Sequence, residues 1–117
     1  MKTRLFLTVI SLAVLLAACA PAAATATSTP VTNGNEVKVA ISGYAFNPGT
    51  ITIKVGQTVT WTNQDSASHN VKADDGSFGS STLGNGASFS YTFNTAGTFT
   101  YKCGFHASML GTVVVQP

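Results

Sequence analysis

Hydrophobic and polar residues alternate along most of the chain after residue 35. In "VKVAI" (37–41) every second residue is apolar, and "ITIKV" (51–55) and "FTYKC" (99–103) show the same pattern. Alternation with a period of two predicts β-strands that bury one face and expose the other. The expected inward positions are Val37, Val39, Ile41, Ile51, Ile53, Val55, Val59, Trp61, Phe89, Tyr91, Phe93, Phe99, Tyr101, Cys103, Val113 and Val115.

Turn sequences separate these alternating stretches. They include "NPG" at 47–49, "DDG" at 74–76, "GNG" at 84–86 and "TAG" at 95–97, which are residue types that favour reversals of the chain. No helical periodicity of useful length is present. Short strands at this spacing predict an all-β fold, specifically an antiparallel Greek-key β-sandwich.

The N-terminal segment has a different pattern. The basic "MKTR" is followed by the apolar run "LFLTVISLAVLL", which is shorter than the ~20 residues that a membrane span needs. We therefore interpret residues 1–18 as a signal peptide. The run "LAAC", which ends at Cys19, resembles the lipobox of bacterial lipoproteins and implies that Cys19 carries lipid. The alternative is an ordinary signal peptide cleaved within the alanine-rich run.

Residues 19–35 have neither charge nor hydrophobic periodicity, so we expect a lipidated cysteine followed by a flexible tether. The globular domain is expected to span residues 36–117. The formal charge of +2 comes from Lys2 and Arg4 in the leader, because the basic and acidic residues beyond it balance. The domain therefore lacks the excess of basic residues that nucleic-acid binding requires, and nucleic acid is not an expected partner.

The segment "YKCGFHASMLG" (101–111) brings together three residues that can bind a metal: Cys103, His106 and Met109. The remaining histidine is His69, which follows the expected strand that contains Trp61. Two imidazoles, a thiolate and a thioether form a soft ligand set that suits copper cycling between Cu(I) and Cu(II). Alternatively, Cys103 and Met109 fill the core, and both histidines are ordinary loop residues.

Other metal groups suit these residues less well. Structural zinc prefers four cysteine or histidine ligands, and an iron–sulfur cluster needs about four thiolates. The attachment sequence of a c-type haem is absent. Among metals, the residues therefore favour copper.

Two longer runs then relate the chain to a known family. "YAFNPGTITIKVGQTVTWTNQDSASHNV" (44–71) and "GTFTYKCGFHASMLGTVVV" (97–115) resemble the copper-binding motifs of cupredoxins, the small blue-copper proteins, of the plastocyanin and amicyanin type. The resemblance implies a type 1 site with His69, Cys103, His106 and Met109 as ligands. It further implies that Asn70 ties the ligand loops together.

The chain departs from the family pattern where Phe105 replaces the usual proline before the second histidine. This leaves a backbone N–H that could hydrogen-bond near the cysteine sulfur and alter the redox potential. Lys102 precedes the cysteine, where plastocyanins often have an aromatic residue.

The resemblance implies a non-enzymatic carrier of single electrons between larger redox proteins. The expected route passes through His106, at an apolar docking patch formed by Tyr44, Phe105, Ala107 and Leu110. We expect a monomer, exported and anchored through Cys19 to the cell envelope, facing the periplasm or the cell exterior.

Alternatives are a copper-delivery lipoprotein, a plain β-sandwich adhesin, and an oxidase or nitrite-reductase-like domain. The last needs further imidazoles for a catalytic copper, and the chain has two histidines in all.

Overall fold

The computed structural model describes residues 32–117. The expected signal peptide, the lipidation site Cys19 and most of the expected tether lie outside these residues. No helix in the described part is long and apolar enough to cross a membrane.

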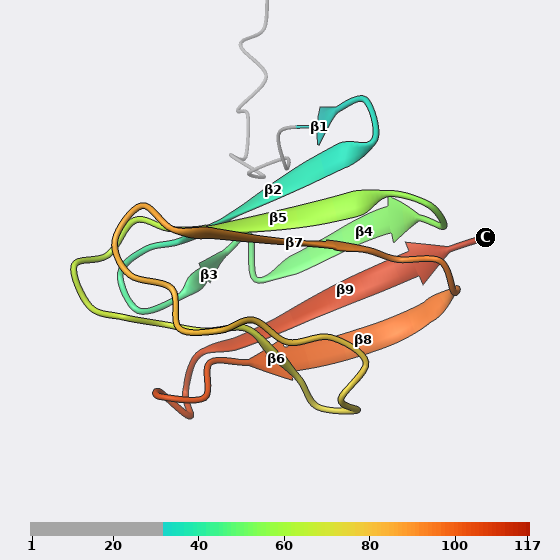
Figure 1. The fold of residues 1–117 in the computed structure, drawn as a ribbon. Helices are drawn as coiled ribbons and strands as arrows, with labels where there is room; N and C mark the ends of the chain where they lie inside the picture. Colours follow the sequence, from blue (N-terminus) through green and yellow to red (C-terminus); the bar gives the residue numbers. More distant parts are fainter. Residues whose placement is uncertain (1–31) are drawn as a thin grey trace, which may run out of the picture.

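Within residues 32–117 the elements are all strands, arranged in two sheets (Figure 1). The first sheet has the order β1 (Thr32–Asn33), β2 (Glu36–Ile41), β5 (Thr58–Asn63) and β7 (Ser88–Thr92), with β3 (Phe46–Asn47) also paired to β2. The second has the order β4 (Thr50–Lys54), β9 (Leu110–Gln116), β8 (Gly97–Lys102) and β6 (Lys72–Ala73). The short strand β1 lies within the range expected to form the tether.

The prediction of an all-β sandwich is confirmed, but the sheets are mixed rather than purely antiparallel. β2 pairs with β5 in parallel, and so does β4 with β9. After β3 the chain forms β4 in the second sheet and then returns as β5 beside β2. Parallel neighbours need such a crossover, whereas a tight hairpin gives an antiparallel pair.

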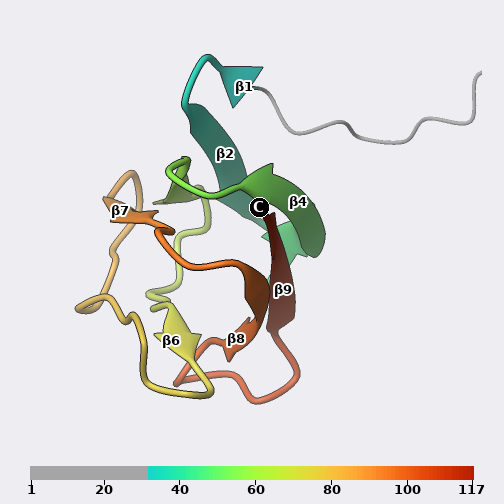
Figure 2. The ribbon, with the colours of Figure 1, turned by 90° about the vertical axis from the view of Figure 1, so that its right-hand side faces the viewer.

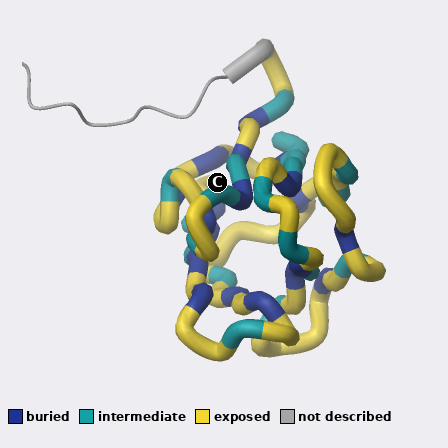
Figure 3. Tube along the Cα trace, turned by 90° about the vertical axis from the view of Figure 1, so that its left-hand side faces the viewer, coloured by how far each residue is buried: buried dark blue, intermediate teal, exposed yellow. Residues whose placement is uncertain are grey.

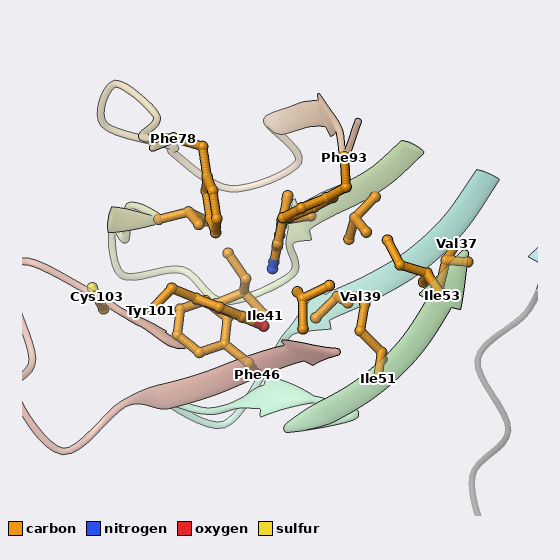
Figure 4. Packing of buried hydrophobic residues seen from close by; sticks show 14 of the residues in the cluster. Val37, Val39, Ile41, Phe46, Ile51, Ile53, Phe78, Phe93, Tyr101 and Cys103 are labelled. Atoms are coloured by element: carbon orange, nitrogen blue, oxygen red, sulfur yellow. The ribbon is translucent and has the colours of Figure 1, made fainter. Parts of the chain in front are cut away.

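Side chains from both sheets fill the interior, which the strands surround in the end-on view of Figure 2. Most of the expected inward residues are buried, and Trp61 and Val59 are completely so. Phe89, Tyr91 and Phe99 are half-buried and pack against this core. Figure 4 shows Cys103 beyond Tyr101 at one end of the core and Val37 with Ile53 at the other.

Val55 is a correction to the predicted pattern, because its side chain is 42% exposed. β4 ends at Lys54, and Val55 leads into a turn in which Gly56 has a φ of 91°. The period-two pattern therefore stops one residue before the valine. Conversely, Phe78 and Leu83 lie in the connection between β6 and β7 and are buried, although no alternation marks them.

Three connecting loops meet at one end of the sandwich: 42–45 after β2, 64–71 after β5 and 103–109 after β8. In Figure 1 this is the left-hand end, opposite the C-terminus. Figure 3 views the molecule from that end and shows mainly exposed loop backbone with short buried stretches. The candidate metal ligands lie in two of these loops.

Candidate metal centre

The turn between β8 and β9 carries Cys103, His106 and Met109. The Cys103 N–H donates to the Met109 carbonyl at 3.1 Å, and the Met109 N–H donates to the His106 carbonyl at 3.0 Å. These bonds close the loop, so that three residues predicted as ligands come from one compact turn. Cys103 and Met109 are each 1% exposed, and His106 is half-buried.

His69 reaches the same place from the connection between β5 and β6, and its side chain is fully buried. The backbones of His69 and Leu83 exchange two hydrogen bonds, of 3.1 and 2.7 Å. Asn63, also fully buried, donates from its amide to the Ala67 and Leu83 carbonyls at 2.9 and 2.8 Å. The loop that places His69 is thus held by bonds at both of its ends.

The side chains of His69, Cys103 and His106 converge. The His69 Nδ1 lies 3.2 Å from the His106 Nδ1, and each of these nitrogens is 3.7 Å from the Cys103 sulfur. One potential ligand atom from each residue therefore lies within 4.8 Å of the other two. Such a cluster of two imidazole nitrogens and one sulfur can bind a single ion.

Asp65 determines which nitrogen of His69 faces this cluster. Its Oδ2 lies 2.9 Å from the His69 Nε2, and an ionised carboxylate can only accept a hydrogen bond. The Nε2 therefore carries the hydrogen, and the Nδ1 presents its lone pair to the cluster.

The Asp65 carboxyl has a pKa lowered from its usual value. The largest cause is the N–H of Tyr44; the N–H of Gly43 and the His69 ring contribute, while partial desolvation acts in the opposite direction. Asp65 is therefore ionised at neutral pH.

Asn70 connects the two ligand loops. Its Oδ1 accepts a hydrogen bond from the Gly104 N–H at 2.5 Å. A Cβ added at Gly104 would lie 3.0 Å from this oxygen and 2.9 Å from the Cδ of Lys72. A side chain at position 104 would therefore have to displace Asn70 and Lys72, and Asn70 has the linking position that the resemblance implies.

The residues expected to form the docking patch are all exposed. Tyr44 is 55% exposed, Phe105 54% and Leu110 63%, and Ala107 is also in the exposed class. The Tyr44 ring stands edge-on to both His69 and His106, with centroids 5.3 and 5.0 Å apart. Of these exposed residues, Tyr44 thus packs against the half-buried imidazole of His106.

One expectation about a neighbouring residue, that the Phe105 N–H bonds near the Cys103 sulfur, is wrong. Within residues 32–117 the polar neighbours of the Cys103 sulfur are the two histidine nitrogens, and the Phe105 N–H is not among them. Lys102, which precedes the cysteine, forms an exposed ion pair, in which its Nζ lies 3.6 Å from the Asp74 carboxylate. Both partners are well exposed, so this pair contributes at most ~1 kcal/mol to stability.

The donor set fits copper. Two imidazole nitrogens and a buried thiol form a soft site, and the buried Met109 belongs to the same turn, where its backbone is hydrogen-bonded to Cys103 and His106. The sequence model of the copper-binding proteins of the plastocyanin/azurin family matches residues 34–116. The chain belongs to this family.

Individual relatives agree with this assignment. The cupredoxin is similar to plastocyanin from Scenedesmus fuscus, with 38% identity across 61% of this chain and 86% of the relative. It is 34% identical to amicyanin-alpha from Methylorubrum extorquens across 86% of this chain and 87% of the relative. An oxidised methionine-to-leucine variant of amicyanin superposes with a TM-score of 0.67 at 32% identity, covering 74% of this chain and 86% of that one. Copper is therefore the metal of this cupredoxin, and His69, Cys103, His106 and Met109 form its type 1 site.

One structural neighbour is an enzyme, a copper-containing nitrite reductase from Thermus scotoductus. The TM-score is 0.66 at 28% identity, but the match covers 76% of this cupredoxin and only 25% of the reductase. The similarity is thus to one portion of a longer chain. Both histidines of this cupredoxin belong to the cluster already described.

Sequence reasoning missed Asn63 and Asp65. Asn63 continues the inward alternation of Val59 and Trp61, so a polar residue at an inward position was a usable signal. For Asp65 the signal was weaker: the sequence shows only a carboxylate four residues before His69. The pairing of Asp65 with the Gly43–Tyr44 backbone depends on a contact between distant segments.

Proposed function

We propose that this cupredoxin carries single electrons between larger redox proteins at the outer face of a membrane. The observation that supports this most is the arrangement of the ligands: His69, Cys103 and Met109 are at most 1% exposed, whereas His106 reaches the surface inside an apolar patch. Copper supplies a one-electron couple when bound. Because three of the four ligands are buried, the fitting activity is electron exchange through His106 across the patch.

The patch suits brief contacts with a partner. Tyr44, Phe105 and Leu110 are more than half exposed, and beyond the leader the charged residues balance to zero. A small apolar surface without strong charge favours weak, transient association. The residues around His106 would admit a partner's redox centre close to the imidazole edge.

Met109 is proposed as the weak axial ligand. Its side chain is buried, and its backbone bonds to both His106 and Cys103. The axial ligand tunes the potential of blue-copper sites. Met109→Gln should therefore retain copper but shift the reduction potential, and an unchanged potential would exclude the axial role.

Cyclic voltammetry with a copper chelator present tests the carrier proposal. The wild-type protein should show a reversible one-electron couple and keep its copper over many cycles, because three of its ligands are buried. Cys103→Ser should lose the blue colour but retain the β-sheet circular dichroism. Rapid loss of copper to the chelator on reduction would instead support the delivery alternative.

The anchor is proposed from the lipobox-like run that ends at Cys19. Expression of the full chain in a bacterium, followed by metabolic labelling with a fatty acid, tests it. Wild type should be labelled and sediment with membranes, whereas Cys19→Ala should be unlabelled and remain in the soluble fraction. Labelling of the Cys19→Ala variant, or none in wild type, would contradict the anchor.

A further inference from the structure

The Asp65 carboxylate is shared between two parts of the molecule. Its Oδ1 accepts a hydrogen bond from the Gly43 N–H at 2.8 Å. Its Oδ2 accepts one from the Tyr44 N–H at 2.9 Å and lies 2.9 Å from the His69 Nε2. The side chain is only 15% exposed, and His69 is fully buried. One carboxylate thus joins the loop after β2 to a ligand imidazole.

The loop that Asp65 holds has an unusual backbone. Gly43 and Tyr44 have φ values of 61° and 55°, and Tyr44 is the one non-glycine residue with positive φ in the described part of the chain. Left-handed conformations are unfavourable for residues with a Cβ. They persist where the surroundings hold them, as often happens beside functional sites. Here both consecutive N–H groups donate to Asp65.

The conformation of Tyr44 has a direct consequence for the copper ligands. Its ring stands perpendicular to both imidazoles, at 89° to His69 and to His106. The ring thus packs against the outer side of the histidine pair. Asp65 therefore acts on His69 through a hydrogen bond and on both imidazoles through Tyr44.

We propose that Asp65 is a positioning residue of the copper centre, which fixes the His69 ring with its Nδ1 toward Cys103 and holds Tyr44 against both ligand imidazoles. The inference depends on copper binding but not on the partners or the anchor. A carboxylate bonded to a ligand imidazole increases the basicity of that ligand. It also places a negative charge near the metal, which favours the more highly charged Cu(II). Asp65 should therefore lower the reduction potential.

The competing interpretation is purely structural: Asp65 holds the loop and stabilises the fold, with no effect on the metal. Asp65→Asn separates the two interpretations, because it conserves shape. An amide oxygen in the Oδ2 position can still accept from Tyr44 and His69, whereas the NH₂ group then faces the Gly43 N–H. This variant loses the charge and one hydrogen bond, while the other two can remain.

The reduction potential and copper affinity are measured for wild type, Asp65→Asn and Asp65→Ala. For Asp65→Asn we expect a higher potential; a tenfold loss of Cu(II) affinity at unchanged Cu(I) affinity corresponds to about 59 mV. For Asp65→Ala we expect copper affinity to fall by about 10–100-fold, as is typical when the hydrogen-bond partner of a metal ligand is removed. The control is Asp75→Asn, which removes a carboxylate that is bonded to Ser77 in an exposed turn. It should change neither quantity.

A second measurement needs no copper. Nitrogen-15 NMR of the metal-free protein reports which nitrogen of His69 carries hydrogen. Wild type should show the Nε2–H form, and Asp65→Ala should show a mixture of tautomers. If Asp65→Ala does not fold, the reduction potentials of Asp65→Asn and Tyr44→Gly decide the question. Tyr44→Gly relieves the backbone and removes the ring, so it should alter the potential while His69 keeps its tautomer.

The inference is overturned if Asp65→Asn leaves the potential unchanged and the alanine variant leaves the His69 tautomer unchanged, even if both lower the unfolding midpoint. In that case the carrier proposal stands, provided that the wild-type couple is reversible. An irreversible wild-type couple would reject the carrier proposal instead, and the tautomer measurement would still decide the role of Asp65.

Discussion

Hydrogen bonds to single residues define the chemistry of this centre. Asp65 leaves the lone pair of the His69 Nδ1 free for a metal. The side-chain oxygen of Asn70 accepts a hydrogen bond from the Gly104 N–H in the neighbouring ligand loop. The backbone of Tyr44 adopts a φ of 55°, a conformation that costs about 1–2 kcal/mol for a residue with a Cβ. Two hydrogen bonds to Asp65 and the contacts of the ring with the imidazoles offset this cost.

Tyr101 provides a prediction about pH. Its hydroxyl is buried without a hydrogen-bond partner among the described residues. Burial raises the pKa of Tyr101 to about 12, and the side chain of Trp61 lowers this pKa to a smaller extent. Since the folded pKa lies above the unfolded value of 10.0, ionisation of Tyr101 has no effect on stability well below pH 10. As the pH rises toward about 12, the unfolded state ionises first and stability falls, by roughly 2–3 kcal/mol in all.

Tyr101→Phe should therefore be at least as stable as wild type at neutral pH, because it removes an unpaired buried hydroxyl. At a pH of about 11 the variant should be clearly more stable. Urea unfolding of the metal-free protein at both pH values measures this. A wild type and variant that lose stability in parallel above pH 10 would contradict the assignment of the raised pKa in the folded state.

At the scale of elements, the pairing of β8 with β9 brings the ligand turn to the end of the core. Tyr101 lies opposite Gly111 in this pair. A Cβ at position 111 would collide with the Tyr101 ring, which is 1% exposed and has no room to move. The register next to the ligand turn therefore depends on a glycine facing a large aromatic residue.

Gly111→Ala should destabilise the protein by about 1–3 kcal/mol or more, since overpacking displaces buried side chains. Because Cys103 is two residues from Tyr101, a weaker blue absorption is also expected. The matched control is Gly84→Ala, where an added Cβ meets nothing within 4 Å. Urea unfolding midpoints measure the difference, and equal midpoints for the two variants would show that the register tolerates the Cβ.

At the scale of the whole molecule, the two ends of the sandwich differ in function. The ligand loops and the apolar patch form one end, whereas Val55 lies in a turn at the end near the C-terminus (Figure 1). Both ends thus offer an exposed apolar side chain, Leu110 at one and Val55 at the other. This permits a matched test of the docking patch without a known partner.

Electron self-exchange between reduced and oxidised copies requires two patches to meet. Leu110→Glu places like charges at that contact and should slow self-exchange, with partial recovery at high salt because salt screens exposed charges. Val55→Glu adds the same charge at the opposite end and should leave the rate unchanged. NMR line broadening in mixtures of the two oxidation states measures the rate. Equal slowing by both variants would locate the contact elsewhere.

Copper should stabilise the whole fold, because the four ligands join two distant loops only in the folded state. Free copper at 100 times its dissociation constant adds about 2.7 kcal/mol to the free energy of unfolding. For a domain of this size, this raises the midpoint temperature of thermal unfolding by about 10–20 °C. Cys103→Ser should lose most of this gain. Thermal unfolding with and without copper measures it; an equal gain in the variant would show that copper binds elsewhere.

The sequence predicted much of this protein because several of its signals are local. Alternation identified the buried faces of β2, β5 and β9 correctly. The spacing of Cys103, His106 and Met109 within one turn and the one remaining histidine, His69, marked the candidate metal site, and the resemblance to cupredoxins implied that all four are ligands. Predictions based on alternation alone were wrong at Val55 and missed the buried Phe78 and Leu83, because burial in loops does not follow strand periodicity.

Short-range patterns in the sequence alone therefore determined most of the strands and of their inward faces, and they marked three candidate ligands in one turn. Only the tertiary structure decided the parallel pairing of β2 with β5, the convergence of His69 on Cys103, and the bridge from Asp65 to the backbone of Tyr44. These features join residues that lie 20 or more positions apart. Such contacts form only when the whole sandwich closes, so no local pattern of residues specifies them.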